Sequence, residues 1–174
     1  MKKYELTNET KTLAGGTVLH RIRALQDIPR FDVKAGELGG FVEGENNLSQ
    51  DGDAWVFCNA NVYGNAKVYD DAEVSGDAKV YGYVEISGYA EISGNACVSG
   101  DADYMVIKNT WSSGRWFTYT RSNKKWAVGC FYGTGEELIK KAYADSELSG
   151  KCYEAIVHAV ETIEAAKAEA KETK

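Results

Sequence analysis

Residues 62–80 read VYGNAKVYDDAEVSGDAKV, and within this stretch a unit of six residues returns three times. The same period extends from Asp51 to Tyr104. A small apolar residue recurs at Ala54, Ala60, Ala66, Ala72, Ala78, Val84, Ala90, Ala96 and Ala102. An aliphatic residue follows two positions later, at Val56, Val62, Val68, Val74, Val80, Ile86, Ile92 and Val98. Glycine occupies a third position of the unit at Gly52, Gly64, Gly76, Gly82, Gly88, Gly94 and Gly100, and Cys58 and Asp70 replace it.

The chemistry of this unit predicts a parallel β-helix. The two apolar residues are two positions apart, so on a strand they point to the same side. Glycine followed by Asn or Asp tolerates positive φ and forms a corner. Three such corners close a coil of about 18 residues, and successive coils pair as parallel strands about 4.8 Å apart. The repeat is long enough for three coils.

The coil predicts which side chains lie above one another. We expect three inner columns, formed by Val56, Val74 and Ile92, by Val62, Val80 and Val98, and by Val68 and Ile86. On the outside, Tyr63 should stack on Tyr81 and Lys67 should pair with Glu85. A helical or amyloid-like structure explains neither the period of six nor the fixed position of glycine.

The flanks predict three regions: an N-terminal β cap and lead-in coil over 1–50, the repeat over 51–104, and a C-terminal α+β cap over 105–174. A stack this short needs caps, because its end coils expose apolar core and strand edges. We expect a hairpin around Ala14-Gly15-Gly16, with Val42 and Leu48 in phase with Ala54. The C-terminal cap should hold a meander of three strands, 104–111, 115–121 and 125–131, and two helices.

Thr134-Gly135-Glu136-Glu137 has the form of a capping box at a helix start, and this helix should end near Tyr143. The last helix, about 147–168, carries an apolar stripe that should pack on the rest of the protein. The stripe consists of Leu148, Cys152, Ile156, Val160 and Ile163.

Composition narrows the classes of function. The net charge of −6 disfavours general binding to nucleic acid or to a membrane surface, which needs accumulated Lys and Arg. The four cysteines are scattered, and Met1 is followed by Lys2, Lys3 and polar residues. These features predict a reduced, soluble, cytoplasmic protein.

The charge is unevenly distributed along the chain. Residues 51–104 contain ten acidic residues against Lys67 and Lys79, a net charge of −8. Residues 105–133 contain five basic and no acidic residues, a net charge of +5, interleaved with aromatic residues. Arg115, Phe117, Tyr119 and Arg121 should alternate on one face of a strand, and arginine with aromatic rings suits a planar anionic ligand. The candidate ligand-binding residues are Trp111, Arg115, Trp116, Tyr119, Arg121, Lys124, Lys125 and Trp126. The alternative is that the rings form the core of the cap, while the cations face acidic coils of a neighbouring subunit.

The repeat VYGNAKV resembles the hexapeptide repeats of left-handed β-helix proteins, the trimeric acyltransferase-like superfamily. Four further segments resemble an uncharacterised family of bacteriophages and prophages: YELTNETK (4–11), HRIRAL (20–25), GELGGFVE (36–43) and WSSGRWFTYTRSNKKW (111–126). The resemblance implies a left-handed helix and a homotrimer, neither of which follows from the hexad spacing. It implies no activity, and it would place the protein in the host cytoplasm.

The sequence offers no obvious catalytic group. The resembling acyltransferases place a histidine base on the coils, whereas here the only histidines are His20 and His158, both outside the repeat. No cofactor or metal is expected, and no cysteine has neighbours that would activate its thiol. We therefore expect a non-catalytic binding protein that captures an anionic, nucleotide-like ligand or a host defence protein, in counter-defence against bacterial immunity. The alternatives are a structural assembly module and an acyltransferase.

Overall fold

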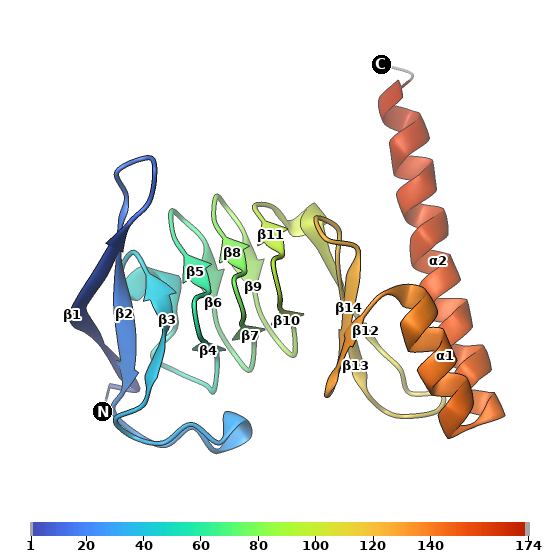
Figure 1. Cartoon of the computed structure of the whole chain (residues 1–174), viewed down its shortest axis with the longest axis horizontal. Coiled ribbons are helices and arrows are strands. Elements are labelled where there is room, and N and C mark those ends of the chain that lie inside the picture. Colours follow the sequence, from blue (N-terminus) through green and yellow to red (C-terminus); the bar gives the residue numbers. More distant parts are fainter. Residues whose placement is uncertain (1, 173–174) are drawn as a thin grey trace.

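The computed structural model describes residues 2–172, with side chains as far as residue 170. The chain is mainly β, and its centre is a β-solenoid of about three stacked coils (Figure 1). Its strands are β4 (Trp55–Val56), β5 (Asn61–Val62), β6 (Lys67–Val68), β7 (Glu73–Val74), β8 (Lys79–Val80), β9 (Glu85–Ile86), β10 (Glu91–Ile92) and β11 (Cys97–Val98). The period of six thus produces one short strand per hexad.

The strands form three parallel sheets, one for each face of the coil. The first face contains β5, β8 and β11, the second β4, β7 and β10, and the third β6 and β9. The predicted columns are confirmed, because Val56 pairs with Val74, Val62 with Val80, and Val68 with Ile86. Their side chains are fully buried and form the solenoid core.

The predicted contacts on the outside of the coils are also confirmed. The rings of Tyr63 and Tyr81 stack with centroids 5.2 Å apart and an angle of 8° between their planes. The ammonium of Lys67 lies 3.7 Å from a carboxylate oxygen of Glu85. Both pairs join one coil to the next, so the coil length inferred from the repeat is the one that the chain adopts.

The two residues that replace glycine at the corners adopt the backbone conformation that glycine would. Cys58 has φ 53° and Asp70 has φ 57°, both in the left-handed region. The neighbouring corner at Gly64 has φ 67°. These corners therefore adopt positive φ whatever the side chain, which explains why glycine is preferred there; Gly100, which leads into the short helix after the last coil, is extended.

The N-terminal segment is a hairpin that continues the first face of the solenoid. Its strands β1 (Tyr4–Thr12) and β2 (Val18–Ala24) are antiparallel, and β2 pairs with β3 (Leu38–Val42). Strand β3 then pairs in parallel with β5. The buried ammonium of Lys3 donates a 2.8 Å hydrogen bond to the carbonyl of Ala54, and burial lowers its pKa to about 8. These contacts attach the hairpin to the first coil.

The expected phase of the lead-in coil is wrong. Val42 pairs with Val62, and Leu48 forms a bridge with Val68, so both belong to the aliphatic columns and not to the Ala54 position. The lead-in coil contains two more residues than a regular coil. Its corner is the short helix η2 (Glu45–Asn47), in which buried Asn47 donates hydrogen bonds to the carbonyls of Gly64 and Ala66.

The C-terminal sheet has four strands, one more than expected. These are β12 (Tyr104–Lys108), β13 (Trp116–Thr120), β14 (Lys125–Val128) and β15 (Phe131–Gly133), in sequential antiparallel order. The short helix η3 (Asp101–Asp103) leads into β12. The amide of Glu91 donates a hydrogen bond of 3.0 Å to the hydroxyl of Thr118, which joins the sheet to the last coil.

Helices α1 (Gly135–Asp145) and α2 (Glu147–Glu172) lie on the side of this sheet that faces away from the coils (Figure 1). The predicted capping box at Thr134 and Glu137 is present. The predicted stripe of α2 is buried only in part, because Leu148 is 60% exposed and Ile163 is 41% exposed. Tyr153 and Val157 pack against the sheet in their place. Within residues 2–172, neither helix is long and apolar enough to cross a membrane.

Candidate functional site

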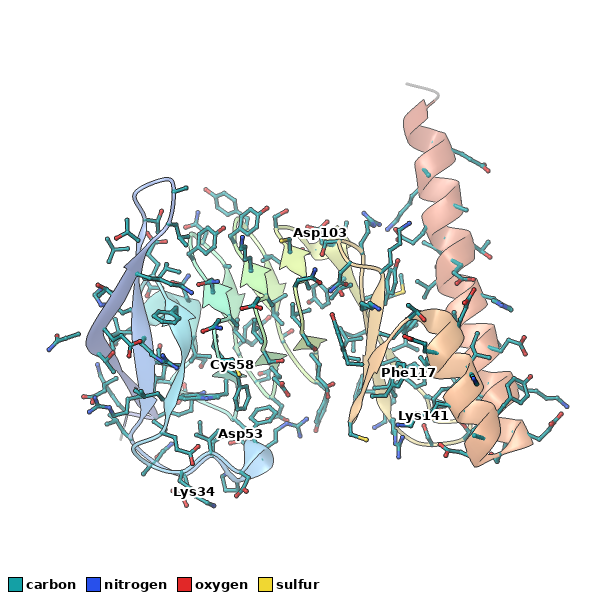
Figure 2. The ribbon with its side chains drawn as sticks, viewed as in Figure 1. Lys34, Asp53, Cys58, Asp103, Phe117 and Lys141 are labelled. Carbon is teal, nitrogen blue, oxygen red and sulfur yellow. The ribbon has the colours of Figure 1, made fainter. Side chains whose placement is uncertain are left out.

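Three of the eight predicted ligand-binding residues are held in contacts with the C-terminal helices. Tyr119 and Trp126 lie in a second core between the C-terminal sheet and the two helices, next to Phe117 (Figure 2). The guanidinium of Arg121 forms two hydrogen bonds with the carboxylate of Glu164 on α2, of 2.6 and 2.9 Å. The predicted face of β13 is therefore covered by helices in this structure.

The other five residues lie towards the two opposite ends of β13. Trp111, Arg115 and Trp116 belong to the end where β13 begins, whereas Lys124 and Lys125 follow the end where it stops. A strand of this length places the two ends about 15–20 Å apart. The structure does not bring the eight residues to one surface, but it leaves Arg115 exposed and Trp116 half-buried.

Trp116 belongs to a stack of two aromatic rings, each of which has a cation nearby. Its ring stacks on Tyr89, with centroids 4.9 Å apart and 15° between the planes. The guanidinium of Arg30 lies 4.6 Å from the centroid of the Tyr89 ring, and the ammonium of Lys108 lies 4.8 Å from that of Trp116. We call Arg30, Tyr89, Trp116 and Lys108 the cation–aromatic stack.

Three separate elements supply this stack. Arg30 lies on the short helix η1 (Pro29–Phe31) of the loop between β2 and β3. The ring of Phe31 packs edge-on against Phe57 at 5.6 Å, which holds this loop against the second face of the solenoid. Tyr89 follows the corner glycine Gly88, and Trp116 pairs with Lys108 across β13 and β12. Residues far apart in sequence thus meet at one point.

Two carboxylates of adjacent coils lie near the stack. Glu91 pairs with Glu73 across β10 and β7. Burial raises the pKa of Glu91 to about 7, and the charge of Glu73 adds to this rise while Arg30 opposes it. Glu91 is therefore about half protonated at neutral pH. Among the side chains that the structure describes, no carboxylate lies within ion-pair distance of Arg30, Lys108 or Arg115.

The sequence pattern does not mark Arg30, Tyr89 and Lys108 as site residues. Lys108 was counted in the basic segment, and its position on the strand next to Trp116 was a signal that could have found it. Tyr89 resembles the other tyrosines of the repeat. Arg30 carries no signal in the sequence, because its contact with Tyr89 depends on the path of a loop.

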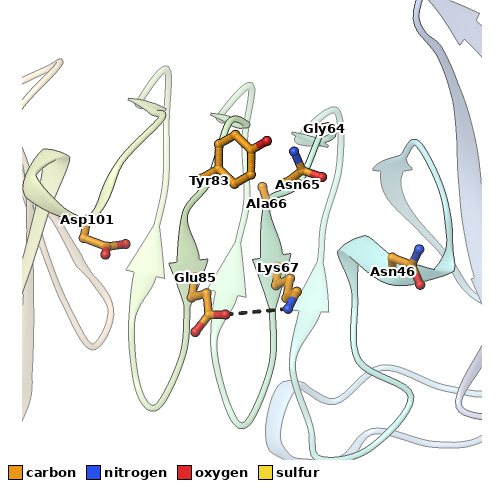
Figure 3. Close-up of a pocket in the computed structure, with 8 residues that line it drawn as sticks. All are labelled: Asn46, Gly64, Asn65, Ala66, Lys67, Tyr83, Glu85 and Asp101. Carbon is orange, nitrogen blue, oxygen red and sulfur yellow. Dashed lines mark ion pairs between the residues drawn. The ribbon is translucent and has the colours of Figure 1, made fainter.

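The third face of the solenoid carries a groove of 580 Å³ (Figure 3). Its floor includes Gly64 and Ala66, and the Lys67–Glu85 ion pair crosses it. Asn46 and Asp101 border it on the N-terminal and C-terminal sides. Tyr83 projects at its edge with 85% of its surface exposed, the largest exposure among the large apolar side chains described.

The described residues contain few groups suited to other kinds of chemistry, such as metal binding. Within them, no group of three or more His, Cys, Asp or Glu side chains is close enough to hold a metal ion. The four cysteines are free thiols, and Nδ1 of His20 lies 3.4 Å from the carbonyl oxygen of Thr7.

The fold defines the chain as a β-solenoid protein with a short C-terminal α+β region. No protein-family model matches its sequence, and no curated protein matches it. The case for a binding site therefore rests on the residues and surfaces of this chain.

Proposed function

We propose that this chain is a non-catalytic β-helix protein that captures an anionic, nucleotide-like ligand at the Trp116 end of the cation–aromatic stack. The left hand of the coils, their capping by the two flanking regions and a homotrimeric assembly are part of this proposal. The hand and the trimer rest on the resemblance to hexapeptide-repeat proteins. A role in phage counter-defence rests on the phage-type resemblance alone.

The observation that carries the proposal is the ammonium of Lys108, which lies 4.8 Å from the centroid of the Trp116 ring. A cation over an exposed aromatic ring contributes only about 0.5–1 kcal/mol. A nucleobase stacked on an aromatic side chain contributes about 1–3 kcal/mol. A planar ligand therefore displaces Lys108 from Trp116 with a net gain, and the Trp116 ring is supported by its stacking on Tyr89.

The displaced lysine then has an anionic group to bind. Lys108 is exposed, and so is Arg115, the residue before Trp116 in the chain. Arginine binds a phosphate through two parallel hydrogen bonds, and lysine adds a point charge. The half-protonated Glu91 repels a phosphate less than an ordinary carboxylate would. Capture in this manner requires no catalytic residue, which suits a repeat without histidine.

The proposal predicts a specific gain in thermal stability with ligand. Purified protein is heated with a panel of cyclic dinucleotides and ADP-ribose derivatives, and the melting temperature is measured. A ligand at 100 times its Kd adds about 2.7 kcal/mol, which is about 5–10 °C for a domain of this size. The double variant Lys108→Ala, Arg115→Ala should lose this shift, while recovery of unmodified ligand after denaturation indicates capture without turnover.

The matched control is the double variant Lys140→Ala, Lys141→Ala on α1. It removes the same charge and also one lysine over an aromatic ring, since Lys141 lies 5.7 Å from the Phe131 centroid. This control should keep the full shift. An equal loss of the melting-temperature shift in both double variants would mean that the shift depends only on net charge. Recovery of modified ligand after denaturation would indicate an enzyme.

A purely structural assembly role is the second candidate, and the groove of the third face favours it. Exposed aromatic residues are frequent anchors of protein interfaces, and here the projecting Tyr83 and a hollow of 580 Å³ lie on the same face. A surface with both a projection and a hollow suits contact between identical subunits. This role becomes the better account if no ligand of the panel changes the melting temperature.

A further inference from the structure

Helix α2 has a second apolar face that the described chain leaves mostly exposed, since only its Cys152 packs against the core. Its inner face, formed by Tyr153, Val157 and Val160, packs on the C-terminal sheet. A second row lies about a third of a turn around the helix, with residues spaced four, three and four apart. We call this row the outer stripe; it consists of Leu148, Cys152, Ala155, Ala159, Ile163, Ala166 and Ala170. An eleven-residue repeat of this kind is typical of paired helices.

The N-terminal half of the outer stripe forms one wall of an apolar groove of 500 Å³. The opposite wall comes from Ile107 and Trp111, and Trp111 is 65% exposed. Lys151 is the only charged residue of the lining. A groove of this size and apolar lining is suited to a helix, which binds such surfaces through small and aliphatic side chains.

The C-terminal half of α2 extends beyond the body of the protein (Figure 1). Val160 is its last buried residue, and between residues 161 and 170 every residue except half-buried Glu164 is exposed. A helical segment of this length has little stability in water without packing. Within this segment, Ile163, Ala166 and Ala170 continue the outer stripe. The segment therefore presents an exposed apolar face that a partner could cover.

We propose that α2 pairs with α2 of a second copy in antiparallel orientation, so that the projecting half of each helix lies in the groove of the other. In the register centred on Ala159, Leu148 faces the partner's Ala170 and Ile163 faces the partner's Ala155. Each large side chain therefore meets a small one, and Ala159 faces its own copy. The contact is isologous, since the same surface is used by both subunits.

The charges beside the stripe favour the antiparallel orientation. Lys151 and Glu169 are 18 positions apart, or about five turns, so they lie on the same flank of the helix. An antiparallel pair brings Lys151 near the partner's Glu169 twice, whereas a parallel pair would leave these two residues about five turns apart. Helix α2 has six acidic and three basic residues, which disfavours an anionic lipid surface as the partner.

The pairing is tested by the mass of the assembly in solution, measured by sedimentation at micromolar concentrations. Ala159→Glu places two carboxylates against each other at the centre of the contact and should halve the mass of the assembly. Ala168→Glu makes the same chemical change on the opposite side of the exposed segment and should leave the mass unchanged. This comparison holds whether or not the solenoid faces also associate, and it is independent of ligand binding.

A cross-link tests the register. In a protein with Cys58, Cys97 and Cys130 replaced by Ser, Ala166→Cys places a thiol opposite the partner's Cys152. Mild oxidation should then give a disulfide-linked dimer, whereas Ala168→Cys should give little. The proposal is overturned if Ala159→Glu keeps the wild-type mass, if both glutamate variants lose mass alike, or if the Ala166→Cys protein stays unlinked.

Discussion

Two glycines of the repeat differ in what surrounds them, although their backbone conformations are alike. Gly88 has φ 62° and Gly94 has φ 65°. A Cβ at Gly88 would meet nothing within 4 Å, whereas a Cβ at Gly94 would overlap the ring of Tyr132. The Tyr132 hydroxyl donates a hydrogen bond of 3.2 Å to the carbonyl of Ser93, which fixes the ring over this corner. The same residue type therefore has a conformational role at one corner and also a packing role at the other.

We predict that Gly94→Ala destabilises the protein more than Gly88→Ala does. Both substitutions place alanine at positive φ, which costs about 1–2 kcal/mol. Gly94→Ala must also displace Tyr132 and its hydrogen bond, which adds about 1–2 kcal/mol. Urea denaturation of the two variants measures the difference. Equal midpoints would mean that Tyr132 does not hold this corner.

At the scale of elements, α2 is attached to the C-terminal sheet by a core and by one ion pair. The apolar contacts come from Phe117 and Tyr153, whose ring centroids lie 4.7 Å apart. The Arg121–Glu164 pair lies beyond them toward the exposed half of the helix, and both side chains are about a quarter exposed. Bidentate pairs of arginine and carboxylate are stronger than ordinary surface ion pairs. Arg121 therefore positions the helix.

We predict that Arg121→Ala lowers the free energy of unfolding by about 1–2 kcal/mol, because Glu164 loses its bidentate partner while partly buried. Arg115→Ala removes an exposed arginine at the other end of the same strand and should change stability by less than about 0.5 kcal/mol. Thermal denaturation without ligand compares the two. A larger loss of stability from Arg115→Ala than from Arg121→Ala would contradict the role of Arg121 in positioning α2.

At the scale of the whole molecule, the cation–aromatic stack joins three parts of the chain. The loop that carries Arg30 starts from the N-terminal hairpin, Tyr89 belongs to the last coil, and Trp116 belongs to the C-terminal sheet. Glu91 lies beside this junction with its pKa raised to about 7. The charge of one partly buried carboxylate thus affects how the three parts are held together.

The sign of the pH effect follows from the raised pKa of Glu91. The folded state holds the proton more tightly than the unfolded state, so the stabilisation is complete below the ordinary value of 4.5 and is lost as the pH rises through about 7. We predict a fall of about 1–2 kcal/mol in the free energy of unfolding between pH 5 and pH 8, after allowance for the partial exposure of the side chain.

Urea denaturation at several pH values measures this slope. Glu91→Gln should remove much of it and should be more stable than the wild type at pH 8. Glu5→Gln, which removes an exposed carboxylate paired with Arg23, should keep the wild-type slope. An unchanged slope in Glu91→Gln would assign the pH dependence to other groups.

Much of the solenoid could be predicted because its signal is local and repeated. The alternation within each hexad sets which side chains point inward, and the fixed position of the corner residue sets the coil length. The Tyr63–Tyr81 stack and the Lys67–Glu85 pair followed from that length alone. The phase of Val42 and Leu48 did not, because the lead-in coil has two extra residues and a different corner, η2.

The candidate site was less predictable. The alternation of Arg115, Phe117, Tyr119 and Arg121 was read correctly as one face of a strand, but an alternating strand does not indicate what covers each face. Helices α1 and α2 cover this one, and the Glu164 partner of Arg121 comes from a distant helix. The opposite face places Trp116 against Tyr89 of the last coil.

The sequence by itself therefore determined the coils, because their shape depends on backbone conformations and inward side chains within each six-residue unit. Only the tertiary structure decided which cations and rings meet, since Arg30, Tyr89 and Trp116 belong to segments whose relative positions no local pattern records. It also decided that one face of α2 is left uncovered, because a helix with two apolar rows can bury only the row that its own sheet reaches.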